Sequence, residues 1–150
     1  MLADVPDPEI PVVSVVDLGI VRAVDESSDG HGVTVTLTPT YSGCPATEVI
    51  ARDVREALEA SYDVVEVRTQ LAPAWTTDWM TDSAREKLRG FGIAPPGRVL
   101  LPLVDVGRPD SCPHCGSADV EELAGFGSTP CKALWRCTAC REPFDYFKKH

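Results

Sequence analysis

Apolar and polar residues alternate in the first half of the chain in a way that predicts a small β-sheet. Residues 33–38 alternate valine and leucine with threonine, and a period of two is typical of a strand with one buried face. The apolar segment 20–26 predicts a partner strand, because the intervening "SSDGHG" is rich in turn-forming residues. The segment 63–73 predicts a third strand, with Val65, Val67 and Leu71 on one face.

A longer segment, 44–61, carries apolar residues at the spacing of an α-helix. Five of them fall on one predicted face: Ala46, Ile50, Val54, Ala57 and Leu58. We expect Pro45 at the first helical position, where its missing N–H leaves no intrahelical hydrogen bond unmade. Cys44 then lies at or beside the cap of this helix.

A second helical pattern follows in "TDSAREKLRGFGI", residues 81–93. Ser83 and Glu86 fit a capping box at its start. The pattern predicts an apolar stripe and a glycine end, formed by Ala84, Leu88 and Phe91 and by Gly90 or Gly92. A small sheet with two to three helices predicts an α+β domain.

The chain is expected to contain two domains. Gly107 and Pro109 interrupt an apolar stretch just before a cysteine-rich tail. We therefore expect an α+β domain over residues 1–105, a linker at 106–111, and a small zinc-ribbon domain with four cysteine ligands over 112–150.

Composition and charge narrow the classes of function. Apolar residues make up 43% of the chain and charged residues 25%, as in globular proteins. Residues 1–105 hold 17 acidic and 8 basic side chains, a net charge of −9, which would repel the phosphates of a nucleic acid.

No apolar run approaches the ~18–20 residues that span a membrane, and the start lacks the pattern of a secretory signal. We expect a cytoplasmic protein, where reducing conditions favour metal-binding or reactive cysteines over disulfides.

Four of the six cysteines form two CxxC pairs separated by 21 residues. Two such turns can present four thiolates to one ion, at a spacing typical of zinc sites: Cys112, Cys115, Cys137 and Cys140. Four thiolates close the coordination shell, so the expected role is structural. Iron, as a single ion or a cluster, and a pair of disulfides are the alternatives. Cys131 is left over, either as a small buried residue or as an extra thiol near the metal.

The sixth cysteine, Cys44, stands alone in "TYSGCPATEV". At a helix start, free N–H groups and the helix dipole favour a thiolate. Gly43 allows close backbone approach, and several hydroxyl groups could hydrogen-bond an anionic sulfur or a ligand: Thr38, Thr40, Ser42 and Thr47. The alternative is a cysteine that only packs in a loop.

The sequence contains no set of residues for turnover chemistry that we can identify. His31, within a predicted turn, is the single histidine of residues 1–105, so a Cys–His pair for hydrolysis is not expected. Phosphate-binding loops, dinucleotide fingerprints, nucleophile elbows and HExxH pairs are also absent. We predict no catalytic residue.

Three segments together resemble a known small domain. They are "VPDPEIPVVSVVDLGIVRAV", "TPTYSGCPATEVI" and "LAPAWTTDWMTDSAREKLRGFGIAPP", and they resemble the iron–sulfur-assembly targeting proteins, including the SufT-like ones. With the tail "CPHCGS…FDYFKKH", the chain resembles the PaaD family, the accessory subunits of the phenylacetyl-CoA epoxidase (phenylacetate-CoA oxygenase) system.

The resemblance implies an accessory role in aerobic phenylacetate degradation: delivering or maintaining an iron–sulfur cluster for the reductase of the epoxidase. The family's reactive cysteine falls on Cys44, and its other motifs fall on Asp7–Pro11, on Asp17–Gly19 and on Trp75. Asp17 is thereby expected to support the Cys44 site.

The cofactors and partners follow from the same resemblance. We expect a structural zinc and a transient iron–sulfur cluster, with the reductase and iron–sulfur assembly proteins as partners and a homodimer as a further assembly to test. Two alternatives remain: an electron-carrying subunit with iron in the tail, or a structural subunit of the epoxidase complex in which Cys44 only packs.

Overall fold

The computed structural model describes residues 1–97 and 107–150. They form two compact units, Met1–Ala84 and Arg85–His150, which are described separately below. Within the described residues, no helix has the length and apolar character needed to cross a membrane.

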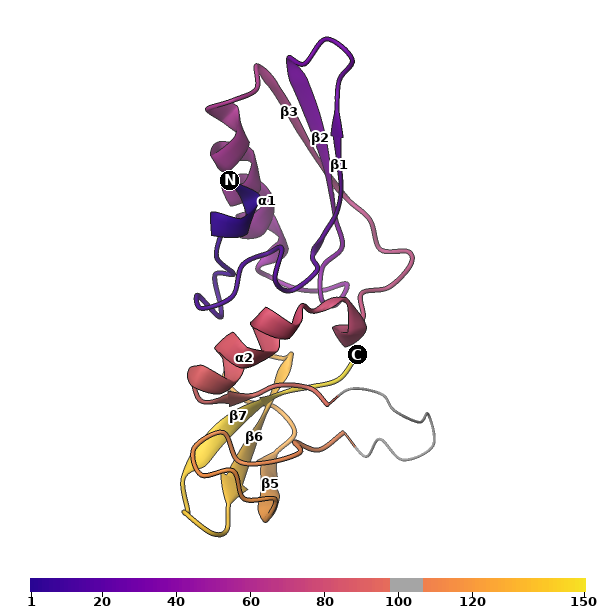
Figure 1. Ribbon diagram of the computed structural model, residues 1–150. Coiled ribbons are helices and arrows are strands. Elements are labelled where there is room, and N and C mark those ends of the chain that lie inside the picture. Colours follow the sequence, from indigo (N-terminus) through magenta and orange to yellow (C-terminus); the bar gives the residue numbers. More distant parts are fainter. Residues whose placement is uncertain (98–106) are drawn as a thin grey trace. The chain divides into compact units, whose positions relative to one another are not determined.

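The first unit is built on a three-stranded sheet in the order β1-β2-β3. Strand β1 (Val21–Glu26) runs antiparallel to β2 (Gly32–Leu37), and β2 runs parallel to β3 (Val64–Thr69). Helix α1 (Thr47–Glu59) connects the two parallel strands and lies along one face of the sheet (Figure 1). These elements confirm the predicted α+β class.

The core of this unit lies between α1 and the central strand. Six residues at the predicted spacings are at most 3% exposed: Val33, Val35, Leu37, Ile50, Val54 and Leu58. Burying a side chain of this size stabilises the fold by about 1.5–3 kcal/mol. The alternating strand and the helical stripe therefore meet as their periods predict.

The N-terminal segment packs against this core through turns rather than strands, apart from a short 3-10 helix at Leu2–Asp4. The buried Asp7 side chain accepts hydrogen bonds from the main-chain N–H groups of Glu9 and Ile10, at 2.9 and 2.8 Å. Such bonds replace those that a strand or helix would supply.

Ser14 and Asp17 close the next turn of that segment. Each side chain accepts a hydrogen bond from the other residue's main-chain N–H, at 3.0 Å in both cases. The segment 5–20 is thus fixed by its own polar side chains, which lets its valines and isoleucines reach the core.

Two predicted element boundaries, the start of helix α1 and the end of strand β3, are wrong. Helix α1 starts at Thr47 with Ala46 as its cap residue, so Pro45 precedes the helix instead of beginning it. Strand β3 ends at Thr69, and Leu71 beyond it is 57% exposed. A cis peptide bond between Ala72 and Pro73 belongs to the segment that follows.

The second helix, α2 (Asp82–Gly90), also differs from its prediction in detail. Its cap is Thr81, whose hydroxyl oxygen accepts a hydrogen bond from the Ala84 N–H at 3.0 Å, so Ser83 is not the capping side chain. Phe91 follows the helix and is 55% exposed, whereas Ala84 and Leu88 are fully buried as expected. The apolar stripe therefore ends one turn early.

The second unit holds a four-stranded sheet in the order β4-β7-β6-β5. A hairpin of β5 (Val120–Ala124) and β6 (Lys132–Cys137) is extended by β7 (Pro143–Phe147), and β4 (Ile93–Ala94) adds a parallel edge. Residues that precede the expected linker thus take part in this sheet. Residue 106 lies outside the described residues, and the expected domain boundaries stay a prediction.

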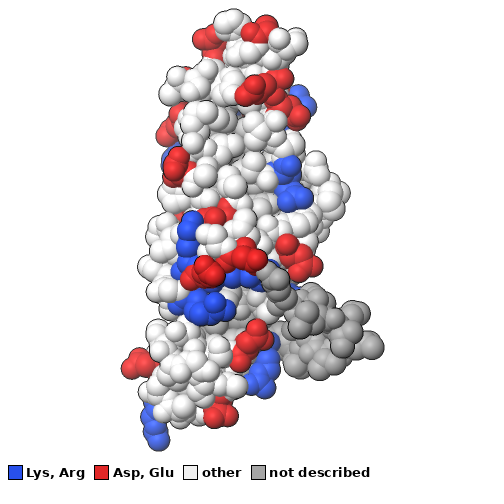
Figure 2. Space-filling view, in the orientation of Figure 1, with Lys and Arg blue, Asp and Glu red and all other residues white. Residues whose placement is uncertain are grey.

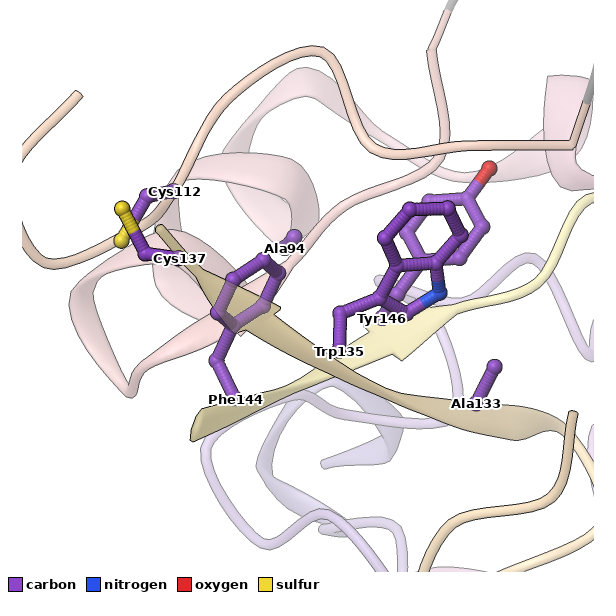
Figure 3. Packing of buried hydrophobic residues seen from close by; sticks show 7 residues of the cluster. All are labelled: Ala94, Cys112, Ala133, Trp135, Cys137, Phe144 and Tyr146. Atoms are coloured by element: carbon purple, nitrogen blue, oxygen red, sulfur yellow. The ribbon is translucent and has the colours of Figure 1, made fainter. Parts of the chain in front are cut away.

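One face of this sheet carries a compact apolar cluster, shown in Figure 3. Its members are Ala94, Cys112, Ala133, Trp135, Cys137, Phe144 and Tyr146. Alternate residues of β6 and β7 supply most of them, because side chains two positions apart share a face of a strand. The Trp135 and Tyr146 rings meet edge to face at 6.1 Å. Figure 3 shows the sulfurs of Cys112 and Cys137 side by side at one end of the cluster.

Candidate metal centre and candidate thiol site

The two CxxC segments fold into turns with matching hydrogen bonds. In each, the N–H of the first cysteine donates to the carbonyl five residues later: Cys112 to Ser117 at 2.8 Å, and Cys137 to Glu142 at 3.0 Å. The residue after each second cysteine has a positive φ, 76° at Gly116 and 68° at Arg141. The two halves of the site are therefore near copies of one another.

These turns bring four sulfur atoms together, and we call the group the four-sulfur site: Cys112, Cys115, Cys137 and Cys140. All four lie within 4.8 Å of one another. Two of the separations are 3.8 Å, between Cys112 and Cys140, and 3.5 Å, between Cys115 and Cys137. Sulfurs bound tetrahedrally at about 2.3 Å from one ion lie ~3.8 Å apart. The four residues thus fit a single metal ion, as predicted.

Main-chain N–H groups point at the sulfurs of this site. The His114 N–H donates to Cys112 Sγ at 3.4 Å, and the Cys140 N–H donates to Cys137 Sγ at 3.5 Å. The Cys140 N–H is the largest cause that lowers the pKa of the Cys137 thiol to about 7. Such bonds favour the thiolate, which is the form that binds metals.

Without a metal, the thiol of Cys140 keeps its proton near neutral pH. The main-chain N–H of Glu142 lowers the pKa of Cys140, but desolvation and hydrogen bonds to Cys115, Cys137 and Cys112 raise it to about 12. A metal ion must therefore displace at least one proton when it binds.

The remaining residues of the tail lie beside the four-sulfur site rather than in it. Cys131 is buried, its sulfur lies 3.0 Å from the Thr129 hydroxyl, and it is outside the group of four. The His114 side chain is exposed and its ring meets Phe144 edge to face at 6.5 Å. The burial of Cys131 is what the packing alternative for this residue predicts, and its role as an extra thiol stays a prediction.

In the first unit, three distant segments meet at one edge of the sheet, which we call the Cys44 edge. Val21 at the start of β1 pairs with Leu37 at the end of β2, and Leu37 pairs with Thr69 at the end of β3. The loop to Cys44, the turn before β1 and the segment to Trp75 therefore all leave the sheet at this edge. The carboxyl ends of parallel strands are a common place for ligand sites.

Hydrogen bonds join these segments to one another. The Trp75 indole N–H donates to the Leu18 carbonyl at 2.9 Å. The Thr81 N–H donates to the Asp17 carbonyl at 3.0 Å, and the Thr38 N–H donates to the Ile20 carbonyl at 2.8 Å.

Gly19 is required where these segments approach most closely. It has a φ of 68°, and a Cβ there would lie 2.5 Å from the Trp79 carbonyl oxygen. A side chain at this position would force the two segments apart.

Cys44 is half-buried in the loop between β2 and α1. Its N–H donates to the Tyr41 carbonyl at 3.1 Å, and its own carbonyl accepts from the Thr47 N–H and hydroxyl at 3.2 and 2.9 Å. The helix start thus holds the main chain of Cys44, and no hydrogen bond of its sulfur is found in residues 1–97 and 107–150.

The other predicted supports are placed as follows. Ser42 and Gly43 are exposed on the same loop, and Thr40 is half-buried. Asp17 bonds the Ser14 N–H at 3.0 Å and the Thr81 hydroxyl at 3.4 Å. These contacts give Asp17 a bracing role at the Cys44 edge. A direct role of these residues at the sulfur stays a prediction.

Thr38 has a buried hydroxyl group whose environment its sequence position alone did not indicate. It is 1% exposed, and its hydroxyl has no hydrogen-bond partner among the described residues. A buried hydroxyl without a partner costs free energy and calls for an explanation. Thr38 begins the loop to Cys44, so this hydroxyl lies at the base of the Cys44 edge.

Surface charges do not mark a further site on the face drawn in Figure 2, where basic and acidic side chains are interspersed. Some surface neighbours are ion pairs, such as Arg52 with Asp53 at 2.7 Å and Arg68 with Glu66 at 2.8 Å. Exposed pairs of this kind contribute about 0–1 kcal/mol each.

Comparisons with known proteins cover both units. A family model described as an iron-sulfur cluster assembly protein matches residues 1–69, and one described as the PaaD zinc beta ribbon domain matches residues 105–148. A crystal structure of a domain of unknown function from Bacillus anthracis is 31% identical, with a TM-score of 0.54, covering 58% of this chain and 83% of that one.

Two relatives connect the chain to named proteins. An Fe-S protein maturation auxiliary factor of Porphyromonas gingivalis (strain ATCC BAA-308 / W83) is 45% identical over 61% of this chain and 86% of its own length. A protein of Escherichia coli (strain K12), named as a subunit of 1,2-phenylacetyl-CoA epoxidase, is 51% identical over 99% of this chain and 88% of its own length. The identity over nearly the whole of both chains, with both domains matched, shows that this chain belongs to the PaaD family.

Proposed function

We propose that this chain is an accessory protein without turnover chemistry of its own, which delivers or maintains an iron–sulfur cluster for the reductase of a phenylacetyl-CoA epoxidase. Its PaaD family membership and its maturation-factor relatives support this role. The cluster, or its iron, is the cargo, and Cys44 is the thiol that receives it.

The observation that carries the proposal is the convergence of three segments at the Cys44 edge. Val21, Leu37 and Thr69 lie side by side across the sheet, and the chain leaves at each of them toward a motif of the assembly-protein resemblance. Packing alone would not require a half-buried thiol on a loop whose first residue, Thr38, carries a buried hydroxyl that lacks a partner among the described residues.

A single thiol suits transfer better than storage. An iron–sulfur cluster is held by about four cysteine ligands, whereas Cys44 is the single cysteine of residues 1–97. The remaining ligands must therefore come from a donor, an acceptor or a second copy of the chain. A cluster bound in this way passes readily to a protein that offers four thiolates.

The four-sulfur site has a separate, structural task in this proposal. Its sulfur separations of 3.5 and 3.8 Å suit one ion, and a ligand set of four thiolates leaves no open position for a substrate. Zinc is the ion that we propose, because such a site requires no redox chemistry. Iron in this site would favour an electron-carrying subunit instead.

Coexpression tests the proposal. The reductase is produced with the wild-type chain, with Cys44→Ala, or with Glu48→Ala, an exposed control residue on the first turn of α1. We expect the Cys44→Ala chain to lower the iron and sulfide content of the reductase, while the control has no effect. Equal cluster content with accessory chains of equal abundance would remove Cys44 from the mechanism. A coloured accessory chain with iron in place of zinc would support electron transfer.

A further inference from the structure

A cavity lies beside the second cysteine turn and shares one residue, Cys137, with the four-sulfur site. It has a volume of about 300 Å³ and is lined by Glu121, Arg136, Cys137, Thr138 and Arg141. This volume is at the small end of the range for ligand pockets. Two of its five lining side chains are guanidinium groups, so the cavity offers many hydrogen-bond donors to whatever enters it.

Only part of the Arg136 guanidinium group is hydrogen-bonded to its neighbour in the sheet. It stands opposite Glu121 on β5, and its Nε and one terminal nitrogen both donate to the same carboxylate oxygen, with the Nε bond at 2.8 Å. Both side chains are about half exposed. In the described parts of the chain, no other hydrogen bond of this guanidinium is found, so its second edge can bind a ligand.

Arg141 occupies a position where the backbone favours glycine. Its φ is 68°, and the equivalent residue of the first cysteine turn is Gly116, with a φ of 76°. Residues 1–97 and 107–150 supply no hydrogen bond or ion pair to the Arg141 side chain. A strained backbone that presents an unpartnered cation to a cavity indicates a task outside the fold itself.

We propose that Arg136 and Arg141 bind a carboxylate group in this cavity. Guanidinium groups pair with carboxylates through two parallel hydrogen bonds. The Glu121 carboxylate places negative charge nearby, and a divalent ion held by four thiolates in the proposed metal site would add to it. This charge disfavours a doubly charged phosphate more than a singly charged carboxylate. The carboxylate can belong to a small acid or to an acidic side chain of a partner protein, and both present the same chemistry.

A competing explanation is that the two arginines only offset the negative charge of the metal–thiolate group. The two explanations differ in what Arg141→Gly does. Gly116 shows that glycine supports the same turn, so under our proposal this variant keeps its metal and loses the ligand. If the charge is offset instead, the variant binds its metal more weakly.

Nuclear magnetic resonance of the zinc-loaded, full-length chain tests the proposal, with acetate exchanged for chloride at constant ionic strength. We expect saturable shifts at Thr138, Arg141 and the Arg136 side chain. Arg141→Gly should weaken acetate binding on the order of tenfold or more with zinc content unchanged. Arg55→Gln, at an exposed arginine of α1, is the matched control and should bind acetate as the wild type does.

Three results would overturn the proposal: no shift beyond that of chloride, equal acetate binding by Arg141→Gly, or loss of metal from that variant with acetate binding unchanged. The source of the ligand is settled with a capped peptide that carries one glutamate and its glutamine counterpart. Glutamate-dependent binding tighter than that of acetate assigns the cavity to a partner protein, and binding equal to that of acetate assigns it to a small acid.

Discussion

In the second unit four sulfur atoms lie within 4.8 Å of one another. In the first unit a single thiol, Cys44, lies on a loop that leaves the sheet where three separate segments meet. The four-sulfur site is assembled by two short turns that carry their own hydrogen bonds. The Cys44 edge depends on the strand pairing of a whole sheet. A site built from local turns is suited to closing around an ion, and a site at an open sheet edge is suited to exchanging a ligand.

The largest expected effect is the loss of one unit's fold while the other unit stays folded. Replacing Cys137 with serine removes a ligand that is also a buried member of the apolar cluster, so the second unit should lose its metal and unfold while the first unit stays folded. Metal analysis and amide hydrogen exchange of the full chain measure both outcomes. Cys131→Ser, next to the Thr129 hydroxyl, is the control and should keep the metal. A Cys137→Ser chain with full metal content would contradict this account.

The second prediction breaks the Cys44 edge instead. Gly19→Ala should lower the free energy of unfolding of the first unit by about 2–4 kcal/mol, through left-handed backbone strain and overpacking against Trp79. Gly30→Ala is the matched control, because Gly30 has a φ of 74° and nothing within 4 Å of its added Cβ. Denaturant unfolding followed by first-unit amides compares them. Equal losses would mean that the Gly19–Trp79 approach is not tight.

The third prediction concerns protons at the four-sulfur site. The thiol of Cys140 has a pKa of about 12 and that of Cys137 a pKa of about 7. Above pH 7 the Cys140 thiol must still lose its proton to bind a metal. Metal affinity should therefore fall as the pH falls, by roughly tenfold per pH unit for each proton displaced. Competition with a chelator between pH 7 and 9 measures the slope. An affinity independent of pH would contradict it.

The smallest effect should come from the residue that distinguishes the two cysteine turns. Arg141→Gly should stabilise the second unit by at most about 1 kcal/mol, because relief of left-handed strain is partly offset by the greater backbone entropy of glycine. Chemical unfolding of the zinc-loaded chain measures the change. A destabilisation would show that the Arg141 side chain makes a contact essential to the turn.

Features that depend on local spacing could be predicted from the sequence. The four metal ligands follow from two CxxC pairs, and Val35 and Val54 follow from the periods of their strand and helix. The predicted places of Leu71 and Phe91 on the apolar faces of a strand and a helix were wrong, because a periodic pattern does not show where its element stops. Both lie just past the end of an element, where an apolar residue can remain exposed.

The Cys44 edge could not be predicted from local patterns, because it arises from strand pairing. The order strand, helix, strand in residues 32–69 was itself a signal, since a helical crossover joins parallel strands. It would have placed the ends of β2 and β3 together. The partnerless hydroxyl of Thr38 and the two-residue strand β4 depend on packing and leave no comparable pattern.

The central claim is that the two sulfur sites bind different metals for different purposes. The most direct test is to offer an iron–sulfur cluster, without oxygen, to the zinc-loaded full chain and to its Cys44→Ala variant, and to measure iron, sulfide and zinc per chain. The account predicts that wild-type protein takes up iron and sulfide, that Cys44→Ala does not, and that both retain one zinc. Equal uptake by the two chains, with zinc displaced from the four-sulfur site, would contradict it.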